Sequence, residues 1–290
     1  MYHITVSPDT YEVLPKQEGN NPFIDLNQKP ILPLARKQHA AFRTHLPNEV
    51  YFEVKTKEHI PDFVFFASGG LSLPRLPEPV VILPSMKTAT RKAELPYDKA
   101  IFERLKIKTY ELPKGIVFEG KAEVAWFNEG TVMLHGYGYR STKGSVFALQ
   151  RLLAKIYKSY GVAPPRCISM RLKSPRTYHL DLALLGYSDT ECCVLSGAFD
   201  PEQIGLLRTV LSSVTILPST DPFLLNAVVF PTKILLHKVP DPSLVAKLKD
   251  VTGKQIVQID VSEFEKSGGA VACLVLPIYD PRLTQTSSPS

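Results

Sequence analysis

Near the C-terminus, the stretch Ser267-Gly-Gly-Ala-Val-Ala-Cys-Leu-Val-Leu-Pro277 places one cysteine between two glycines and a short apolar run. Glycine permits positive φ angles and close backbone approach, and residues 271–276 are typical of a buried strand. Cys273 can be a small core side chain, since free cysteine is among the most buried residue types, or a nucleophile at the start of that strand. This stretch alone favours the core role, so the rest of the chain has to decide.

The composition is that of an ordinary globular protein. The 290 residues are 44% hydrophobic and 21% charged, and 34 basic against 28 acidic side chains give a net charge of +6,. Lysine and arginine are scattered rather than clustered, so nothing indicates nucleic acid as a partner. No run of 18 apolar residues predicts a membrane span, and the N-terminal residues lack the pattern of a secretion signal.

The four cysteines and seven histidines show no spacing typical of a metal site. Cys192 and Cys193 are adjacent, so on a strand they point to opposite faces, which fits neither a local disulfide nor zinc binding. No two histidines follow a His-x-x-x-His pattern. Unpaired cysteines fit a reducing cytoplasm, and we expect neither a metal nor a cofactor.

Many short apolar segments are separated by 25 prolines and 16 glycines. Helices are predicted where apolar residues recur with a period near 3.6, and two of them start directly after Asp-Pro, which favours a helix start. The predicted strands are residues 63–66, 80–83, 116–119, 132–134, 182–185, 192–195, 227–230, 234–237, 256–259 and 271–276,. The predicted helices are residues 33–46, 97–105, 146–160, 201–211 and 242–250.

These segments follow the order strand pair, helix, strand about five times, with no linker between the units. A single ββαβ unit cannot cover its own sheet, so a repeated unit that closes on itself is favoured over two separate domains. We therefore predict an α/β fold with one domain over residues 1–281. A polar, frayed tail is expected over residues 282–290,.

Three stretches place polar side chains beside apolar segments. Tyr178-His-Leu-Asp181 begins a predicted strand, whose period of two puts the histidine and the aspartate on one face,; a surface pair is the alternative. Phe118-Glu-Gly-Lys-Ala-Glu-Val124 supplies two carboxylates, which a hairpin with solvated charges would also explain. Asp62 precedes an apolar run and can be a turn residue,. None of the three is specific by itself.

In chain order, these stretches resemble the pentein, or guanidino-group-modifying, superfamily, and within it the dimethylarginine dimethylaminohydrolases and bacterial arginine dihydrolases. The resemblance covers roughly residues 20–280. Its most specific part is the combination of His179-Leu-Asp181 with Gly268-Gly-Ala-Val-Ala-Cys273. The other matching motifs are Pro61-Asp62, Arg91 with Glu94, Phe118-Glu-Gly120, Gly138-Tyr-Arg-Ser141 and Asn226-Ala227.

The resemblance implies a five-bladed α/β propeller of ββαβ modules around a pseudo-fivefold axis, in agreement with the repeat order. By resemblance, Cys273 is the nucleophile, His179 is the general acid and base, and Glu123 stands where the family usually has a catalytic Asp. The implied substrate contacts are Asp62 and Asp181 for a guanidinium and Arg91 and Arg140 for an α-carboxylate. We add Ser68 and Glu119 as further polar groups that could contact the substrate.

The chemistry of a guanidinium explains why such residues would be needed. It stays charged at neutral pH and presents its donors in a planar fork, which carboxylates bind in bidentate fashion. Its carbon is a poor electrophile, so attack calls for a thiolate and for a proton on the departing nitrogen. The cationic substrate and a nearby charged histidine would lower the thiol pKa. Loss of ammonia or an amine would leave a thiouronium on Cys273, from which water activated by His179 releases the product.

Two departures from the family pattern concern the substrate. Ala67 and Ser68 stand where relatives commonly carry a carboxylate or an amide, and Glu123 is one methylene longer than the usual Asp. We therefore predict a hydrolase of arginine or an N-substituted arginine. The alternatives are an amidinotransferase of the same fold and a catalytically silent arginine-binding protein. A small guanidino compound is the partner we expect, and homo-oligomer formation stays open.

Overall fold

The computed structural model describes residues 1–13, 21–25 and 27–285, which contain five three-stranded sheets. The sheets, each in spatial order, are β15–β1–β2 (Leu276–Ile278, Tyr2–Val6, Glu49–Phe52), β3–β4–β5 (Leu71–Ser72, Val80–Ile82, Lys108–Tyr110), β6–β7–β8 (Val124–Phe127, Val132–Tyr137, Arg166–Arg171), β9–β10–β11 (Leu184–Gly186, Glu191–Leu195, Ser213–Leu217) and β12–β13–β14 (Val228–Val229, Lys233–His237, Gln255–Ile259).

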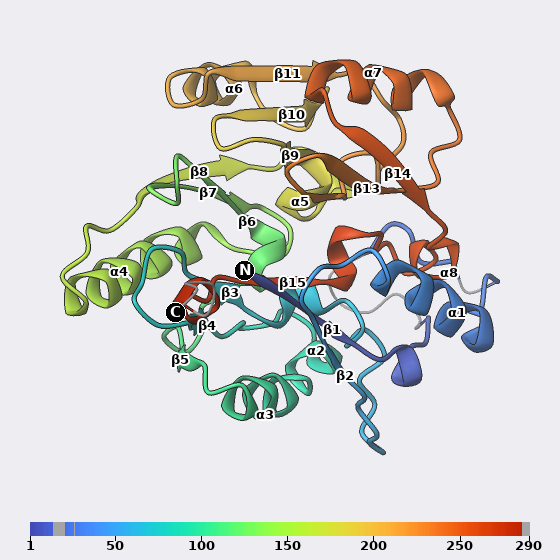
Figure 1. Cartoon of the computed structure of the whole chain (residues 1–290), viewed down its shortest axis with the longest axis horizontal. Coiled ribbons are helices and arrows are strands. Elements are labelled where there is room, and N and C mark those ends of the chain that lie inside the picture. Colours follow the sequence, from blue (N-terminus) through green and yellow to red (C-terminus); the bar gives the residue numbers. More distant parts are fainter. Residues whose placement is uncertain (14–20, 26, 286–290) are drawn as a thin grey trace.

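All five sheets follow one plan. The central strand pairs antiparallel with one neighbour and parallel with the other, and a helical crossover joins the parallel strands, as such a pairing requires. The connecting helices are α1 (Leu32–Arg43), α2 (Ala89–Lys92) with α3 (Leu95–Arg104), α4 (Lys143–Ser159), α6 (Pro201–Arg208) and α7 (Pro242–Thr252). The five long ones lie at the periphery, outside the strands (Figure 1). The predicted ββαβ repeat is therefore present in each sheet.

The first sheet differs from the others in the origin of its strands. Its antiparallel neighbour, β15, comes from the C-terminal end of the chain and pairs with β1 near the N-terminus. Strands β1 and β2 were not predicted from the sequence. The two ends of the chain are thus joined within one sheet, so the N-terminal unit is completed by C-terminal residues.

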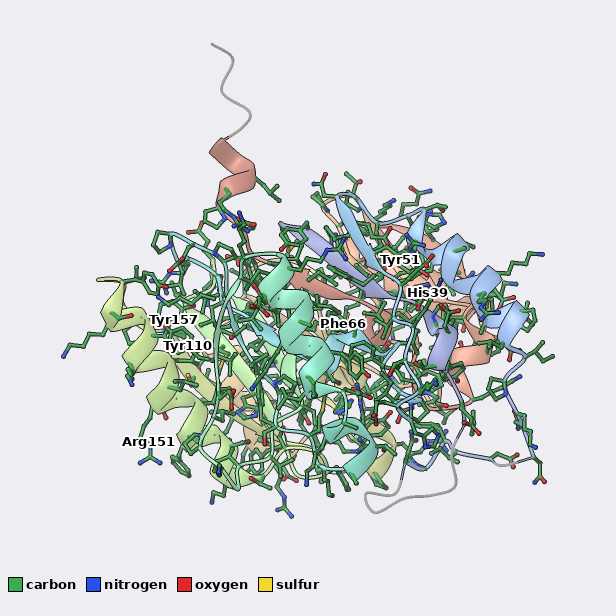
Figure 2. The ribbon with its side chains drawn as sticks, turned by 90° about the horizontal axis from the view of Figure 1, so that it is seen from below. His39, Tyr51, Phe66, Tyr110, Arg151 and Tyr157 are labelled. Carbon is green, nitrogen blue, oxygen red and sulfur yellow. The ribbon has the colours of Figure 1, made fainter. Side chains whose placement is uncertain are left out.

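The helices form where apolar residues recur every 3.6 positions and a residue that favours a helix N-terminus precedes them. Along α4, Leu149 and Leu153 are fully buried, whereas Arg151 points away from the body of the protein (Figure 2). Helix α7 starts after Asp241, whose carboxylate accepts a hydrogen bond from a backbone N–H two residues on, at 2.8 Å,. All five predicted helices are present, with ends shifted by a few residues. No helix of the described residues is both long and apolar enough to span a membrane.

Several predicted strands are confirmed, and three are wrong. Residues 63–66 run through a turn into the 3-10 helix η2 (Phe66–Gly69), residues 116–119 form only an isolated bridge, and residues 271–276 contain the 3-10 helix η5 (Ala272–Leu274) before β15 begins. A short apolar run is compatible with a buried strand or a buried helical turn. Packing decides between them, and here it selects turns at the site that contains Cys273.

Two further segments differ from their predictions. Residues 182–185 belong half to the short helix α5 (Leu180–Ala183) and half to β9. Residues 282–285, predicted as part of a frayed tail, form the short helix α9 (Arg282–Gln285), and the remainder of that tail lies outside the described residues. The other short elements are η1 (Pro8–Thr10), η3 (Gly120–Glu123), η4 (Pro175–Thr177) and α8 (Ser262–Glu265).

Candidate active site

Cys273 lines a small pocket together with most of the residues predicted to form a site. The cavity volume is about 30 Å³, room for roughly two waters. Its lining residues are Asn21, Asp62, Phe65, Ser68, Arg91, Arg140, Tyr178, His179, Ser267, Gly269 and Cys273. They come from segments spread over most of the chain, so the pocket exists only after the sheets have come together.

Asn226 holds the thiol of Cys273. Its Nδ2 donates to Cys273 Sγ at 3.2 Å, and its Oδ1 accepts from the backbone N–H groups of Ala272 at 3.0 Å and Cys273 at 3.3 Å. The motif that contains Asn226 was part of the family resemblance, but the sequence did not indicate this role. Packing explains why residue 269 is a glycine, because a Cβ on Gly269 would lie 2.2 Å from the ring of Phe65.

The thiol of Cys273 is protonated in the absence of a ligand. Burial, followed by the charge of Asp181, raises the pKa of Cys273 to about 12. Burial also raises the pKa values of the other three cysteines, to about 11 or 12. All four cysteines are free, so what distinguishes Cys273 is its position in a pocket with His179. A nearby cation or base is needed before this thiol becomes a nucleophile.

His179 is paired with Glu119 rather than with Glu123. His179 Nε2 donates to Glu119 Oε2 at 2.9 Å, and the same oxygen accepts from Arg140 Nη1 at 3.2 Å. Glu119 is fully buried, which by itself would raise its pKa. The charge of Arg140 and the hydrogen bond with His179 outweigh this effect and hold the pKa of Glu119 well below its usual range. Glu119 is therefore an ionised carboxylate that can stabilise a protonated His179.

Glu123, at the end of η3, has a different environment. Its Oε1 lies 4.0 Å from His179 Nε2, and neither of its oxygens has a hydrogen-bond partner within the described part of the chain, although both are buried. Burial, and then the neighbouring charge of Glu119, raise the pKa of Glu123 well above its ordinary value. Burial therefore favours the neutral acid form of Glu123 beside the ionised Glu119.

Arg91 is held rigidly by a carboxylate on its own helical turn. Arg91 Nε donates to both oxygens of Glu94 at 3.1 and 3.0 Å, and Nη2 donates to Glu94 Oε2 at 2.8 Å and to the Phe65 carbonyl at 3.3 Å. Both side chains are buried. The negative charge of Glu94 outweighs burial and raises the pKa of Arg91. The guanidinium is charged and oriented toward the pocket before any ligand arrives.

Arg140 is positioned by an aromatic ring. Its guanidinium carbon lies 4.8 Å from the centre of the Tyr178 ring, and the Tyr178 hydroxyl donates to the Gly268 carbonyl at 2.8 Å. Such a cation–π contact fixes the plane of a guanidinium. Apart from the bond to Glu119, its terminal donors remain available, and Arg140 Nε has no partner among the described residues. Tyr178 links this arginine to the glycine pair before Cys273, a role that sequence reasoning missed.

Asp62 and Ser68 both line the pocket from the segment around η2. Burial raises the pKa of Asp62, although Arg91 and Arg140 act in the opposite direction. Ser68 is packed tightly from behind, because the neighbouring Gly120 has a φ of +66° and a Cβ there would lie 2.7 Å from the Ser68 carbonyl oxygen. A cation in the pocket would therefore meet the carboxylate of Asp62 and a neutral hydroxyl.

The predicted strand that would place His179 and Asp181 on one face is wrong. His179 is the last extended residue before the helical turn α5, which contains Asp181, and side chains two positions apart in a helix diverge by about 200°. His179 accordingly lines the pocket of Cys273, whereas Asp181 lines a second, larger pocket. Burial raises the pKa of Asp181, opposed by the charge of Lys121. Asp181 is nevertheless close enough to raise the pKa of Cys273.

Comparisons with known proteins agree with this geometry. No protein-family model matches the chain. The bifunctional arginine dihydrolase/ornithine cyclodeaminase AgrE of Nostoc sp. is 31% identical over 225 residues, which are 76% of this chain and 30% of AgrE. The chain thus corresponds to about a third of the length of that relative. The N(G),N(G)-dimethylarginine dimethylaminohydrolase of Mycobacterium tuberculosis is 27% identical over 76% of this chain and 67% of its own length.

Structural similarity extends over nearly the whole chain. The crystal structure of the N-terminal domain of an ArgZ variant, covalently bound to a reaction intermediate, is 27% identical to this chain. It superposes with a TM-score of 0.81 and covers 94% of this chain and 96% of that domain. Because sequence and structure point to the same set of proteins, this chain belongs to the pentein superfamily of guanidino-group-modifying enzymes.

Proposed function

We propose that this protein is a cysteine-dependent hydrolase that acts on the guanidinium carbon of arginine or of an N-substituted arginine. The observation that carries the proposal is the convergence of the Cys273 thiol, His179 paired with Glu119, and Arg91 and Arg140 on one pocket. Related crystal structures support an arginine-like substrate, since ArgZ has been crystallised with its substrate and with its product, and an AgrE variant with L-arginine.

In this proposal, Arg140 is the main anchor for the α-carboxylate of the substrate. In the part of the chain that the structure describes, Glu119 engages one of its terminal nitrogens and no partner is found for the other, so its planar fork can still bind a carboxylate,. Nε and Nη2 of Arg91 already donate hydrogen bonds to Glu94 and to the Phe65 carbonyl. It would add positive charge and one remaining nitrogen. The guanidinium of the substrate would then point away from the two arginines, toward Cys273.

The proposed cradle for the guanidinium consists of Asp62 and Glu119, with Asp181 acting from behind Cys273. A buried carboxylate whose pKa is raised by burial, such as Asp62 or Asp181, gains most from an incoming cation,. Ser68 would contribute its hydroxyl. The cation would also lower the pKa of the Cys273 thiol, so activation of the nucleophile and binding of the substrate would occur together.

The proposed reaction uses His179 twice. Its Nε2 is occupied by Glu119, so Nδ1 is the atom that exchanges protons. Nδ1 accepts the thiol proton, and the sulfur of Cys273 forms a bond to the guanidinium carbon. His179 returns that proton to the departing nitrogen as the C–N bond breaks. Water then loses a proton to His179 and adds to the same carbon, and cleavage of the C–S bond releases a ureido product and regenerates Cys273.

We further propose that the five sheets close into a propeller around a pseudo-fivefold axis, as a single catalytic domain over residues 1–281. The pairing of β15 with β1 supports closure, because it ties the last unit to the first. The peripheral position of the connecting helices also supports it (Figure 1). A cytoplasmic location agrees with four free cysteines,, and homo-oligomer formation stays a prediction.

A catalytically silent arginine-binding protein is the second candidate, and two observations favour it. The cavity of about 30 Å³ must enlarge to admit an amino acid, and burial raises the pKa of Cys273 to about 12. An amidinotransferase is supported by no separate observation in this structure. It would reveal itself by transfer of the amidino group to an amine such as glycine or ornithine.

Mass spectrometry of products from arginine, methylated arginines, agmatine and citrulline tests the proposal. The wild-type protein is expected to convert arginine or a methylated arginine into a ureido product, with a covalent adduct on Cys273 in the intact protein. Cys273→Ser should lose both, whereas Cys167→Ser, on β8 outside the pocket, should keep both. A protein that binds arginine but forms neither product nor adduct would establish the silent binder instead.

A further inference from the structure

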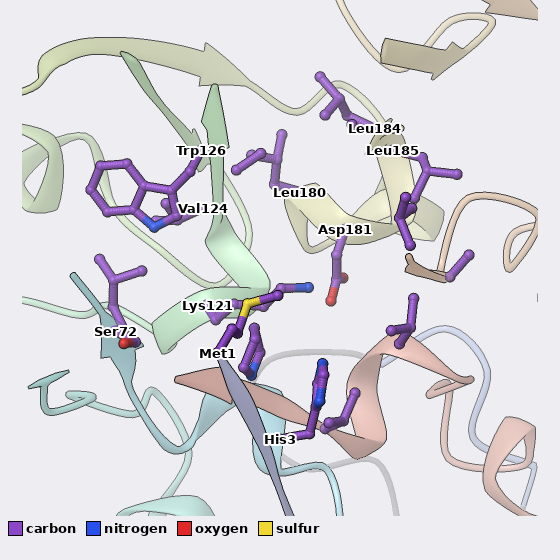
Figure 3. A pocket seen from close by; sticks show the side chains of 18 of the residues that line it. Met1, His3, Ser72, Lys121, Val124, Trp126, Leu180, Asp181, Leu184 and Leu185 are labelled. Carbon is purple, nitrogen blue, oxygen red and sulfur yellow. The ribbon is translucent and has the colours of Figure 1, made fainter. Parts of the chain in front are cut away.

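A second pocket, larger than the one that contains Cys273, is lined by residues that include Asp181, Lys121, His3 and Trp126 (Figure 3). Its cavity volume is about 220 Å³. All five sheets contribute to its wall, through β3, β6, β9 and β12 and, in the first sheet, through both β15 and β1. Neighbouring residues divide between the two pockets: Cys273 and His179 line the first, and Val275 and Asp181 line the second.

Three polar side chains of this second pocket have unused hydrogen-bonding capacity. Asp181 is 7% exposed, and neither carboxylate oxygen has a partner among the described residues. His3 is 3% exposed, and its Nδ1–H donates to the Pro47 carbonyl at 2.9 Å, which leaves Nε2 as an acceptor in the neutral ring,. Among the residues that the structure describes, no hydrogen bond or ion pair involves the ammonium of Lys121. Asp181 and Lys121 point toward the middle of the pocket, and His3 lies opposite (Figure 3).

The rest of the wall is largely aliphatic. It includes Leu184, Leu185, Val228, Val229 and Val275. A mostly apolar cavity with a few converging polar groups is the usual form of a small-molecule site. At the volume that one water requires, 220 Å³ holds roughly fifteen waters,, which is ample for a small amino acid.

We propose that this second pocket binds a small α-amino acid with an aliphatic side chain. The α-ammonium group donates to Asp181 and to His3 Nε2, the carboxylate accepts from Lys121, and the side chain packs on the aliphatic wall. The charges of Lys121 and Asp181 already act on one another. A zwitterion between them suits both groups better than a single charge, because Asp181 repels an anion and Lys121 repels a cation. This site lies outside the pocket of Cys273, but the two share Asp181, which lines the second pocket and also acts on the Cys273 thiol.

The chain contains a single tryptophan, Trp126, and it lines this pocket (Figure 3). Its fluorescence and its one indole proton–nitrogen signal in NMR spectra therefore report directly on occupancy. Titration of the full chain with L-valine, L-norvaline and L-leucine is expected to change both signals in a saturable way. Isovalerate and isobutylamine, which are valine without its amino group or without its carboxylate, should bind at least about tenfold more weakly.

Substitutions can distinguish binding of valine in this pocket from binding in the pocket of Cys273. Lys121→Met keeps the aliphatic stem but removes the charge, and it should weaken valine binding at least about tenfold. Val229→Phe fills the pocket from β12 and should abolish the response, whereas Val251→Phe, on α7 outside the pocket, should preserve it. Arg140→Met, which alters only the catalytic pocket, should preserve it as well.

Three outcomes overturn the proposal. The first is the absence of a saturable signal with any of the amino acids. The second is a response that survives Val229→Phe, or survives Lys121→Met if the phenylalanine variant does not fold. The third is binding of isovalerate or isobutylamine as tight as that of valine. Loss of guanidino turnover is not one of them, because product analysis and the Trp126 signals are independent measurements.

Discussion

Glu119 and Glu123 lie on one short segment and are both fully buried. Substitution of either glutamate by glutamine keeps the shape of the side chain, so the two variants compare the loss of a carboxylate charge at Glu119 with a much smaller change of charge at Glu123. Glu119→Gln removes the charge that pairs with Arg140 at 3.2 Å and with His179 at 2.9 Å. Breaking a buried ion pair by removing one partner costs about 3–5 kcal/mol of stability. The protonated His179 also loses its counter-charge, so kcat should fall by about 10²–10⁴-fold, the usual contribution of general acid–base catalysis.

Glu123→Gln is the matched control. Burial and the charge of Glu119 raise the pKa of Glu123 well above its usual value, so the substitution replaces a carboxyl group whose neutral form is favoured by a neutral amide of the same size. Because the Glu123 oxygens have no geometrically formed hydrogen bond to lose among the described residues, the free energy of unfolding should change by less than about 1 kcal/mol.

The two carboxylates also predict opposite pH dependences of stability. The pKa of Glu119 is lower in the folded than in the unfolded protein, so its contribution is present above the unfolded value of about 4.3 and is lost as the pH falls toward the folded value. The pKa of Glu123 is higher in the folded protein. Its contribution therefore declines as the pH rises from about 4.3 to the folded value, since the native state then binds more protons.

Urea unfolding over a pH series measures the stability effects, and steady-state turnover of arginine measures kcat. Glu119→Gln should abolish the stability that is gained as the pH rises to about 4.3 and is present above it, and Glu123→Gln should abolish the decline. Equal losses of stability and activity in the two variants, or larger losses in Glu123→Gln, would refute the assignment of the charge to Glu119.

Three further predictions concern the same pocket. Without ligand, alkylation of Cys273 by iodoacetamide should be slow near neutral pH and accelerate about tenfold per pH unit, because only the thiolate reacts. Peptide mapping measures the alkylation rate at Cys273, and a rate that stops rising near neutral pH would contradict the raised pKa. Arg140→Ala should raise KM for arginine by about tenfold or more, with the exposed Arg151→Ala as control, and turnover of agmatine equal to that of arginine would exclude the carboxylate anchor. Asp181→Asn should lower kcat/KM at least about tenfold, and kinetics indifferent to it would remove Asp181 from the cradle.

The helices and much of the strand order could be predicted from the sequence, because those signals are local. The period of apolar residues along residues 146–160 and the Asp-Pro starts at residues 201 and 242 depend only on near neighbours in the chain,. Strands such as β10 and β13 are apolar runs in the middle of a sheet, which periodicity detects,. The resemblance then placed Cys273 and His179 in one site, and both line one pocket.

The details of the site were decided only by tertiary structure. Residues 271–276 and 178–181 have patterns that allow a strand, but in the packed protein these segments contain the helical turns η5 and α5. As a result, His179 and Asp181 line different pockets. The sequence could not tell which glutamate pairs with His179, since Glu119 and Glu123 occur in one motif. Arg140, from another segment, pairs with Glu119 and keeps it ionised, while burial raises the pKa of Glu123 and favours its neutral form. Charge states and pockets depend on distances between segments that meet only in the folded chain.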